Sequence, residues 1–104
     1  MNVGQFGSLL IIDLVDNLTG FDKAWLRITR PDHSEFTRDH TAVNITVLNP
    51  GQVTYAFQRG DLTLPGSYQF QVFLENPTDD IGLVSTINTF VVAPILGAAP
   101  APFI

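Results

Sequence analysis

Closely spaced turn sequences, with short segments of alternating side chains between them, constrain the fold of this chain more than any other feature. Val, Ile, Thr and Phe dominate these segments, and such residues favour pleated strands. In residues 67–75, Tyr, Phe, Val and Leu alternate with Gln, Gln, Phe and Glu, a two-residue period that indicates a strand with one packed face. Turns rich in Asn, Asp, Pro and Gly recur at residues 16–20, 31–34, 49–51, 64–66 and 76–80. Turns at such regular spacing predict an all-β sandwich or barrel.

About seven strands are expected, at residues 8–15, 22–30, 36–39, 43–48, 53–58, 67–75 and 83–92. The first is almost continuously apolar, which indicates either burial on both faces or an edge covered by a partner. Trp25 and Phe73 fall on the polar faces of their strands. Either the predicted register is shifted, or the core uses both faces, or these aromatic side chains belong to a subunit contact. Arg27, close to Trp25 in the sequence, is suited to pairing with a carboxylate across such an interface.

Residues 93–104 differ from the rest of the chain, because they contain three prolines and no charged side chain. Proline cannot donate a ladder hydrogen bond, so this segment is predicted to be an extended arm. We expect the arm to dock on this domain or, in preference, on a neighbouring subunit. Its docking residues would be Pro94, Ile95, Leu96, Pro100, Pro102, Phe103 and Ile104. The chain then divides into an N-terminal extension (1–7), a sandwich (8–92) and the arm (93–104).

Charged residues are scarce, with five basic and ten acidic side chains making up 14% of the chain, against about 25% in ordinary soluble domains. The net charge of −5 excludes the basic surface of a nucleic-acid-binding protein, and an apolar content of 45% excludes intrinsic disorder. The apolar runs are too short to span a membrane as a helix. Charge is missing from residues 8–15, apart from Asp13, and from residues 81–104. A subunit of a larger assembly would bury these uncharged ends.

No motif in the chain predicts catalysis, a metal site or a cofactor. Cysteine is absent, which excludes disulfides and cysteine-based sites, and no positive charge precedes the first apolar run, so no signal peptide is expected. His33 and His40 lie near acidic residues but are interpreted as parts of a solvated loop. Asn76 with residues 79–80 could offer oxygens to calcium, although a polar hairpin turn is the preferred interpretation. The Arg-Gly-Asp sequence at residues 59–61 is interpreted as a turn rather than an adhesive motif.

Residues 60–72, Gly-Asp-Leu-Thr-Leu-Pro-Gly-Ser-Tyr-Gln-Phe-Gln-Val, form the most informative stretch. A loop that ends in Pro65-Gly66-x-Tyr68 and enters an alternating strand resembles the entry to the penultimate strand of immunoglobulin-like sandwiches. In those folds a tyrosine closes a corner by bonding to the backbone upstream, which is the structural role expected for Tyr68. The cysteine pair of antibody domains is absent.

Together with Tyr55-x-Phe57 and the strand at residues 83–92, this stretch is similar to the immunoglobulin-like domains of tailed-phage virion proteins. Examples are the N-terminal domain of upper baseplate proteins and small capsid-decorating proteins. The specific part of the resemblance covers about residues 53–92. It implies an all-β, immunoglobulin-like sandwich of about seven strands, followed by the extended C-terminal arm.

The resemblance further implies a non-enzymatic structural subunit of a bacteriophage virion, made in the host cytoplasm. The expected partners are other virion proteins, either major capsid or tail subunits, or further copies of the chain, and neither nucleic acid nor a membrane. Capsid decoration, or cementing, is the first expectation, because no coiled coil or second domain follows the sandwich. A tail, neck or baseplate adaptor is the second. The alternative is a carbohydrate- or receptor-binding module on a virion or cell surface.

Overall fold

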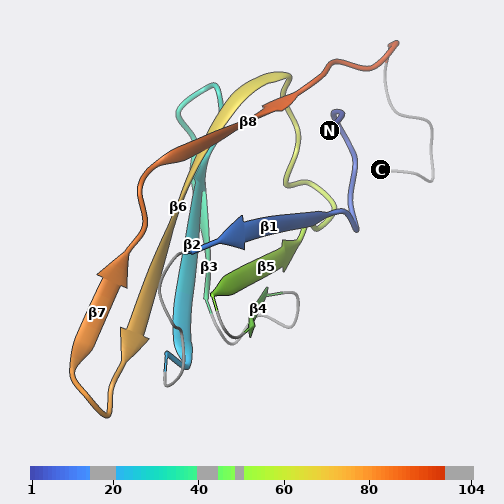
Figure 1. Ribbon diagram of the computed structural model, residues 1–104. Helices are drawn as coiled ribbons and strands as arrows, with labels where there is room; N and C mark the ends of the chain where they lie inside the picture. Colours follow the sequence, from blue (N-terminus) through green and yellow to red (C-terminus); the bar gives the residue numbers. More distant parts are fainter. Residues whose placement is uncertain (15–20, 40–44, 49–50, 98–104) are drawn as a thin grey trace.

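The computed structural model describes residues 1–14, 21–39, 45–48 and 51–97. These residues contain eight strands and no helix, and the strands form two antiparallel sheets. Figure 1 shows the strands of the smaller sheet crossing those of the larger one. The prediction of an all-β sandwich is therefore confirmed.

The smaller sheet has three strands, in the order β1 (Leu9–Asp13), β5 (Gln52–Ala56) and β4 (Ile45–Leu48). The larger, five-stranded sheet begins with β3 (Glu35–Asp39), β2 (Lys23–Thr29) and β6 (Gly66–Asn76). Its far edge holds β7 (Ile81–Val84) and β8 (Asn88–Val92). These two short strands pair one after the other with the two halves of β6, so they share one position in the sheet.

The prediction of one continuous last strand at residues 83–92 is wrong, because the hydrogen-bond ladder with β6 is interrupted between β7 and β8. Ser85 is buried at the interruption, and its hydroxyl accepts a hydrogen bond from the Val72 amide at 2.9 Å. The hydroxyl takes the place of a backbone carbonyl, since serine side chains compete with the backbone for such bonds. The Ser85 amide still donates to the Val72 carbonyl, at 2.9 Å. Residues 86–87 then continue outside the ladder.

The inner faces of the two sheets enclose one hydrophobic core. In β2, β5 and β6 the buried side chains are those that the two-residue period predicts, such as Leu26, Tyr55 and Val72. Phe90 of β8 packs beside this core, with its ring centroid 5.2 Å from that of Tyr68. The buried apolar residues are Leu10, Ile12, Ala24, Leu26, Ile28, Val53, Tyr55, Phe57, Leu62, Tyr68, Phe70, Val72, Leu74 and Val92.

β1 buries only one of its two faces. Leu10 and Ile12 belong to the core, whereas Leu9 and Ile11 on the other face are 57% and 53% exposed. The prediction that both faces of this strand are buried within the chain is therefore wrong. The other interpretation, an edge covered by a partner, stays a prediction. Among the described residues, β1 pairs with β5 alone and lies at the edge of its sheet.

A buried carboxylate connects the two sheets. Asp61, in the loop between β5 and β6, is only 2% exposed. Its side chain accepts hydrogen bonds from the Tyr55 hydroxyl at 2.5 Å and from the Arg38 guanidinium at 3.0 Å. It accepts a third from the backbone amide of Gln58, at 2.9 Å. Tyr55 belongs to the smaller sheet and Arg38 to the larger one, so this Asp61 cluster joins β5 to β3 across the sandwich.

Two arginines contact the aromatic ring of Phe36 beside the Asp61 cluster. The guanidinium carbons of Arg30 and Arg38 lie 4.7 and 4.8 Å from the ring centroid. Arg30 also donates from Nε to the backbone carbonyl of Asp61, at 3.1 Å. Both arginines are therefore engaged within the chain, where they hold the β5–β6 loop against β2 and β3.

Hydrogen bonds of Tyr68 close the entry to β6. Its hydroxyl donates to the Leu64 carbonyl at 2.7 Å and accepts from the Leu64 amide at 3.1 Å. This is the upstream backbone contact that the Pro65-Gly66-x-Tyr68 sequence predicts. Gly66 has a φ of 128°, and a Cβ at this position would lie 3.0 Å from the Pro31 side chain. Glycine is therefore required where the chain enters the strand.

Backbone hydrogen bonds tie the first seven residues to the sandwich. Asn2 forms a parallel bridge with Ala93, and the Ala93 amide donates to the Met1 carbonyl at 2.7 Å. Further along, the Gly7 amide donates to the Phe57 carbonyl at 2.7 Å. Figure 1 shows the start of the chain near the segment that follows β8. The N-terminal extension thus pairs with the residue that directly follows β8.

We predict that Asp61→Ala lowers the free energy of unfolding by about 3 kcal/mol, because it leaves the buried Tyr55 hydroxyl without its acceptor and removes the hydrogen bonds from the Arg38 guanidinium and the Gln58 amide. Urea unfolding measures this loss. Glu35→Ala is the matched control, since it removes an exposed carboxylate from β3. The control should change the free energy by less than about 0.5 kcal/mol. Equal effects of the two substitutions would contradict a role of the cluster in joining the sheets.

Tyr55 should make the stability depend on pH in the alkaline range. Burial, together with the hydrogen bond to the Asp61 carboxylate and its negative charge, raises the pKa of Tyr55 from 10.0 to about 12. Because this pKa is higher in the folded than in the unfolded state, the stabilisation is present below pH 10 and is lost as the pH rises towards 12. In urea unfolding at stepped pH, Tyr55→Phe should lose less stability than the unmodified chain across this range. Identical losses of stability in the two proteins would contradict the assignment of this pH dependence to Tyr55.

Candidate functional site

The three residues expected at an interface lie together on the outer face of the five-stranded sheet. Trp25 of β2 is directly opposite Phe73 of β6, and Phe73 is in turn opposite Val84 of β7. Arg27 lies over the Phe73 ring, with its guanidinium carbon 5.3 Å from the ring centroid. Trp25, Arg27, Phe73 and Val84 together form what we term the outer patch.

The outer patch is separate from the hydrophobic core. Trp25 and Phe73 are half-buried and Val84 is mostly exposed, whereas the core side chains of β2 and β6 point to the opposite face. The predicted register is therefore correct, and the interpretations with a shifted register or a core on both faces are wrong. The third interpretation, a subunit contact, stays a prediction. It fits the apolar side chains of the outer patch, because aromatic residues are enriched at the centres of subunit contacts.

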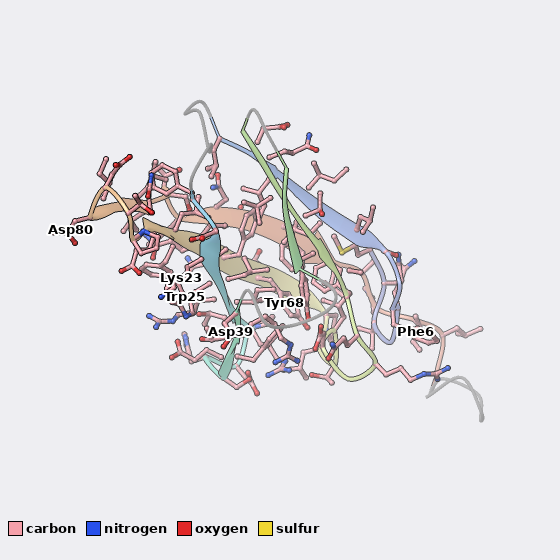
Figure 2. All side chains as sticks on the ribbon, turned by 90° about the horizontal axis from the view of Figure 1, so that it is seen from below. Phe6, Lys23, Trp25, Asp39, Tyr68 and Asp80 are labelled. Carbon is pink, nitrogen blue, oxygen red and sulfur yellow. The ribbon has the colours of Figure 1, made fainter. Side chains whose placement is uncertain are left out.

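Charged side chains border the outer patch. Lys23 and Glu75 are opposite each other on β2 and β6, with 3.8 Å between Nζ and Oε1. Both side chains are nearly half exposed, so their ion pair contributes little to stability. On β3, Asp39 is directly opposite Trp25. Figure 2 shows Lys23, Trp25 and Asp39 on the same side of the molecule, so the aromatic surface has a rim with charges of both signs.

A shallow depression adjoins the outer patch where β7 gives way to β8. The Gln71 side-chain amide donates to the Ser85 carbonyl at 2.9 Å, which holds the interruption against β6. The depression is open to solvent and is lined by Arg27, Thr29, Gln69, Phe70, Gln71 and Ile87. Ligand pockets for small molecules enclose most of the ligand surface. This surface suits contact with a protein or with a flat ring.

Further large apolar side chains are exposed along the edges of both sheets. Leu9 and Ile11 lie on β1, Ile87 lies between β7 and β8, and Val91 lies on β8. Ile87 and Val91 were missed as candidates by sequence reasoning, although apolar residues on both faces of residues 83–92 were a usable signal. Exposed apolar edge strands are sites of association with other chains.

The described part of the C-terminal arm begins at the sandwich and then becomes exposed. Ala93 bonds to the start of its own chain. Pro94 is exposed, Ile95 is half-buried and Leu96 is fully exposed. The remaining docking candidates lie outside the described residues: Pro100, Pro102, Phe103 and Ile104. Docking of the arm on a neighbouring subunit therefore stays a prediction.

The other polar candidates do not converge on a site within the described part of the chain. No group of three or more His, Cys, Asp or Glu side chains suitable for a metal ion is found there. His33 is exposed between β2 and β3, and His40 lies outside the described residues. The Asn76 side-chain amide donates from Nδ2 to the Asp79 carboxylate at 3.2 Å within the β6–β7 turn. The Asp61 carboxylate of the Arg-Gly-Asp sequence is buried, which excludes its presentation as an adhesive motif.

Comparison with protein-family models, with curated proteins and with solved structures gives no match. Among the described residues, no helix has the length and apolar character needed to cross a membrane. The functional interpretation therefore depends on the chemistry of the exposed surface. That surface offers an aromatic outer patch, apolar side chains on the edges of both sheets and the uncharged start of the arm at residues 94–97.

The outer patch should be dispensable for folding. We expect Arg27→Ala to lower the free energy of unfolding by less than about 1 kcal/mol, since an exposed cation–π contact contributes about 0.5–1 kcal/mol. Ile28→Ala, at the next position of β2, removes a fully buried side chain and should cost about 2–5 kcal/mol. Urea unfolding of both variants measures the contrast. A loss for Arg27→Ala as large as that for Ile28→Ala would mean that the outer patch is part of the structural core.

Proposed function

We propose that this chain is a non-enzymatic structural subunit of a bacteriophage virion, which docks onto other virion proteins through its outer surfaces and its arm. The observation that carries the proposal is the set of large apolar side chains exposed on edge strands of both sheets, together with Leu96. The hydrophobic core is formed without them, so they contribute little to the fold of a single copy. Burial of such surface in an assembly would contribute about 25 cal/mol per Å².

The strand order supports the resemblance to immunoglobulin-like sandwiches, which have the order A-B-E-D in one sheet and C-F-G in the other. The order β1-β5-β4 corresponds to B-E-D, and β2-β6 followed by β7 and β8 corresponds to C-F-G, with β3 as an added edge strand. The Tyr68 corner lies at the start of the strand equivalent to F, where these sandwiches place it. We therefore include an immunoglobulin-like topology in the proposal.

Capsid decoration or cementing is the form of this function that we favour, and a tail, neck or baseplate adaptor is the second. A decorating subunit needs contact surface and an extended segment rather than a reaction centre. The outer patch and the sheet edges would supply the contact surface. In the arm, burial of Ile95, Leu96, Phe103 and Ile104 would contribute about 1.5–3 kcal/mol for each side chain, before the cost of ordering the segment.

A carbohydrate- or receptor-binding module is the second candidate, and the outer patch is the observation that favours it. The aromatic rings of Trp25 and Phe73 could stack on a sugar ring, and the nearby amide side chains of Gln69 and Gln71 could bond to its hydroxyls. A glycan array distinguishes the two candidates. Binding that Trp25→Ala abolishes would favour the module, and an array without binding would favour the structural subunit.

Purified phage particles test the proposed function directly. Particles from the source of this chain are separated on a density gradient and analysed by quantitative mass spectrometry. We expect the chain to co-sediment with major capsid or tail proteins at a fixed ratio. Its absence from particles that contain those proteins would contradict the proposal.

Removal of residues 94–104 tests the arm, and it keeps the hydrogen bonds between Ala93 and the N-terminal extension. The melting temperature should stay unchanged, while incorporation into particles should fall about tenfold or more, since 1.4 kcal/mol of lost contact corresponds to tenfold. Thr78→Ala, in the exposed β6–β7 turn, is the control and should be incorporated normally. Normal incorporation of the truncated chain would overturn the role of the arm.

A further inference from the structure

Among the described residues, no strand pairs with the outer edge of β1, where backbone N–H and C=O groups at alternate residues point outward. At one end of the strand, the Phe57 amide donates to the Ser8 carbonyl at 3.0 Å. At the other end, the Leu14 amide donates to the Gly51 carbonyl at 2.6 Å. Bonded pairs alternate along an antiparallel ladder, so the even-numbered residues of this segment bond to β5. The N–H and C=O groups of residues 9, 11 and 13 consequently point away from β5, towards the edge.

The same positions give this edge an apolar and almost uncharged outer surface. Leu9 and Ile11 are 57% and 53% exposed, and the Asp13 carboxylate accepts a hydrogen bond from the Gln52 side chain at 2.9 Å. Edge strands are usually protected by lysine, by proline or by a bulge. Residues 8–14 contain neither lysine nor proline, and from Leu9 to Asp13 the strand pairs with β5 in continuous register. Gly7 and Ser8 both bond to Phe57, so the bulge lies just before the strand. Nothing in the segment itself prevents another strand from adding to it.

We propose that a second copy of this chain occupies the edge, with the two β1 strands paired antiparallel about a two-fold axis at Ile11. This inference rests on the proposed role as an assembling subunit and names its first partner. Ile11 then lies opposite the partner's Ile11, and Leu9 lies opposite the partner's Asp13. The pairing satisfies the free backbone groups of all three positions in each copy. It also joins the two smaller sheets into one continuous sheet.

Charge and strand length select this register. With Ile11 on the axis, the two Asp13 residues lie about 14 Å apart along the strands, four residues at about 3.4 Å each. A register with Ile11 opposite the partner's Asp13 would halve this distance between like charges. A register with Leu9 opposite the partner's Ile11 would instead place Asp13 opposite the partner's Gly7. Gly7 lies outside β1 with a φ of 82°, so one bonded pair would be lost.

A second copy fits this edge because the contact is self-complementary. The same strand supplies both halves, and its apolar centre meets an identical apolar centre. Two-fold contacts of this kind close at two copies, since each copy uses its β1 edge once. The β8 side of the molecule is less available, because Asn2 already pairs with Ala93 at its end.

Sedimentation of the full chain at increasing concentration tests the dimer. We expect a monomer–dimer equilibrium that Ile11→Lys weakens on the order of a hundredfold, because it places two lysines directly opposite each other and removes the central apolar pair. Val91→Lys is the matched control, since it charges an apolar position on the other sheet that is also more than half exposed. The control should leave the dimer intact. A chain that stays monomeric, or equal weakening by both variants, would overturn the proposal.

Single cysteines test the register by cross-linking, since the chain has no cysteine of its own. Residues in a bonded antiparallel pair have Cα atoms about 5.5 Å apart, within the range of a disulfide. Ile11→Cys should therefore form a covalent dimer on mild oxidation. Leu9→Cys should not, because its two copies lie about 14 Å apart along the strands. The reverse result, or no cross-link at either position, would overturn this pairing.

The dimer and the proposed virion role fail in distinguishable ways. Ile11→Lys is compared with the unmodified chain in purified particles as well as in solution. A chain that is monomeric in solution but still co-sediments with particles overturns the β1 pairing and leaves the virion role standing. A chain that dimerises through β1 but is absent from particles supports the pairing and contradicts the virion role.

Discussion

The buried carboxylate of Asp61 is the interaction on which the arrangement of the two sheets depends. A charge removed from water is costly unless it is paired and hydrogen-bonded, and Asp61 meets this condition only when β3, β5 and the β5–β6 loop are all in place. Arg38 also donates to the Tyr55 hydroxyl at 3.2 Å, so the three side chains bond to one another in a closed ring. The cluster therefore favours one position of β5 relative to β3, in addition to the less directional packing of the core.

The geometry of the outer surfaces follows from that arrangement. Because the inner faces fill the core, the apolar residues on the outer faces are not needed to bury the interior. Trp25, Phe73 and Val84 nevertheless line up across three strands, and their positions are set by the register of β2, β6 and β7. A rigid sandwich thus presents the outer patch in a fixed shape, which reduces the entropy lost when a partner binds.

Sequence reasoning succeeded where a structural feature is encoded locally. Strict alternation in β2, β5 and β6 predicted which side chains are buried, and the Pro-Gly-x-Tyr sequence predicted the bond from Tyr68 to the upstream backbone. It failed where a side chain acts on a distant strand. The Ser85 hydroxyl bonds to an amide 13 residues away, and Asp61 bonds to Arg38, 23 residues away. An aspartate in a turn sequence gives no local sign that it is buried.

The edges of the sandwich differ in how they are protected, and this difference bears on how copies could associate. On the larger sheet, the interruption at Ser85 breaks the edge strand into two short pieces, and the N-terminal extension pairs with the residue after the second piece. An edge that is interrupted and partly covered is less open to further pairing. On the smaller sheet, β1 is continuous, apolar on its outer face and unpaired on one side among the described residues. An unprotected edge is a liability for a monomer, whereas in an assembling subunit the same edge provides backbone hydrogen bonds in a defined direction.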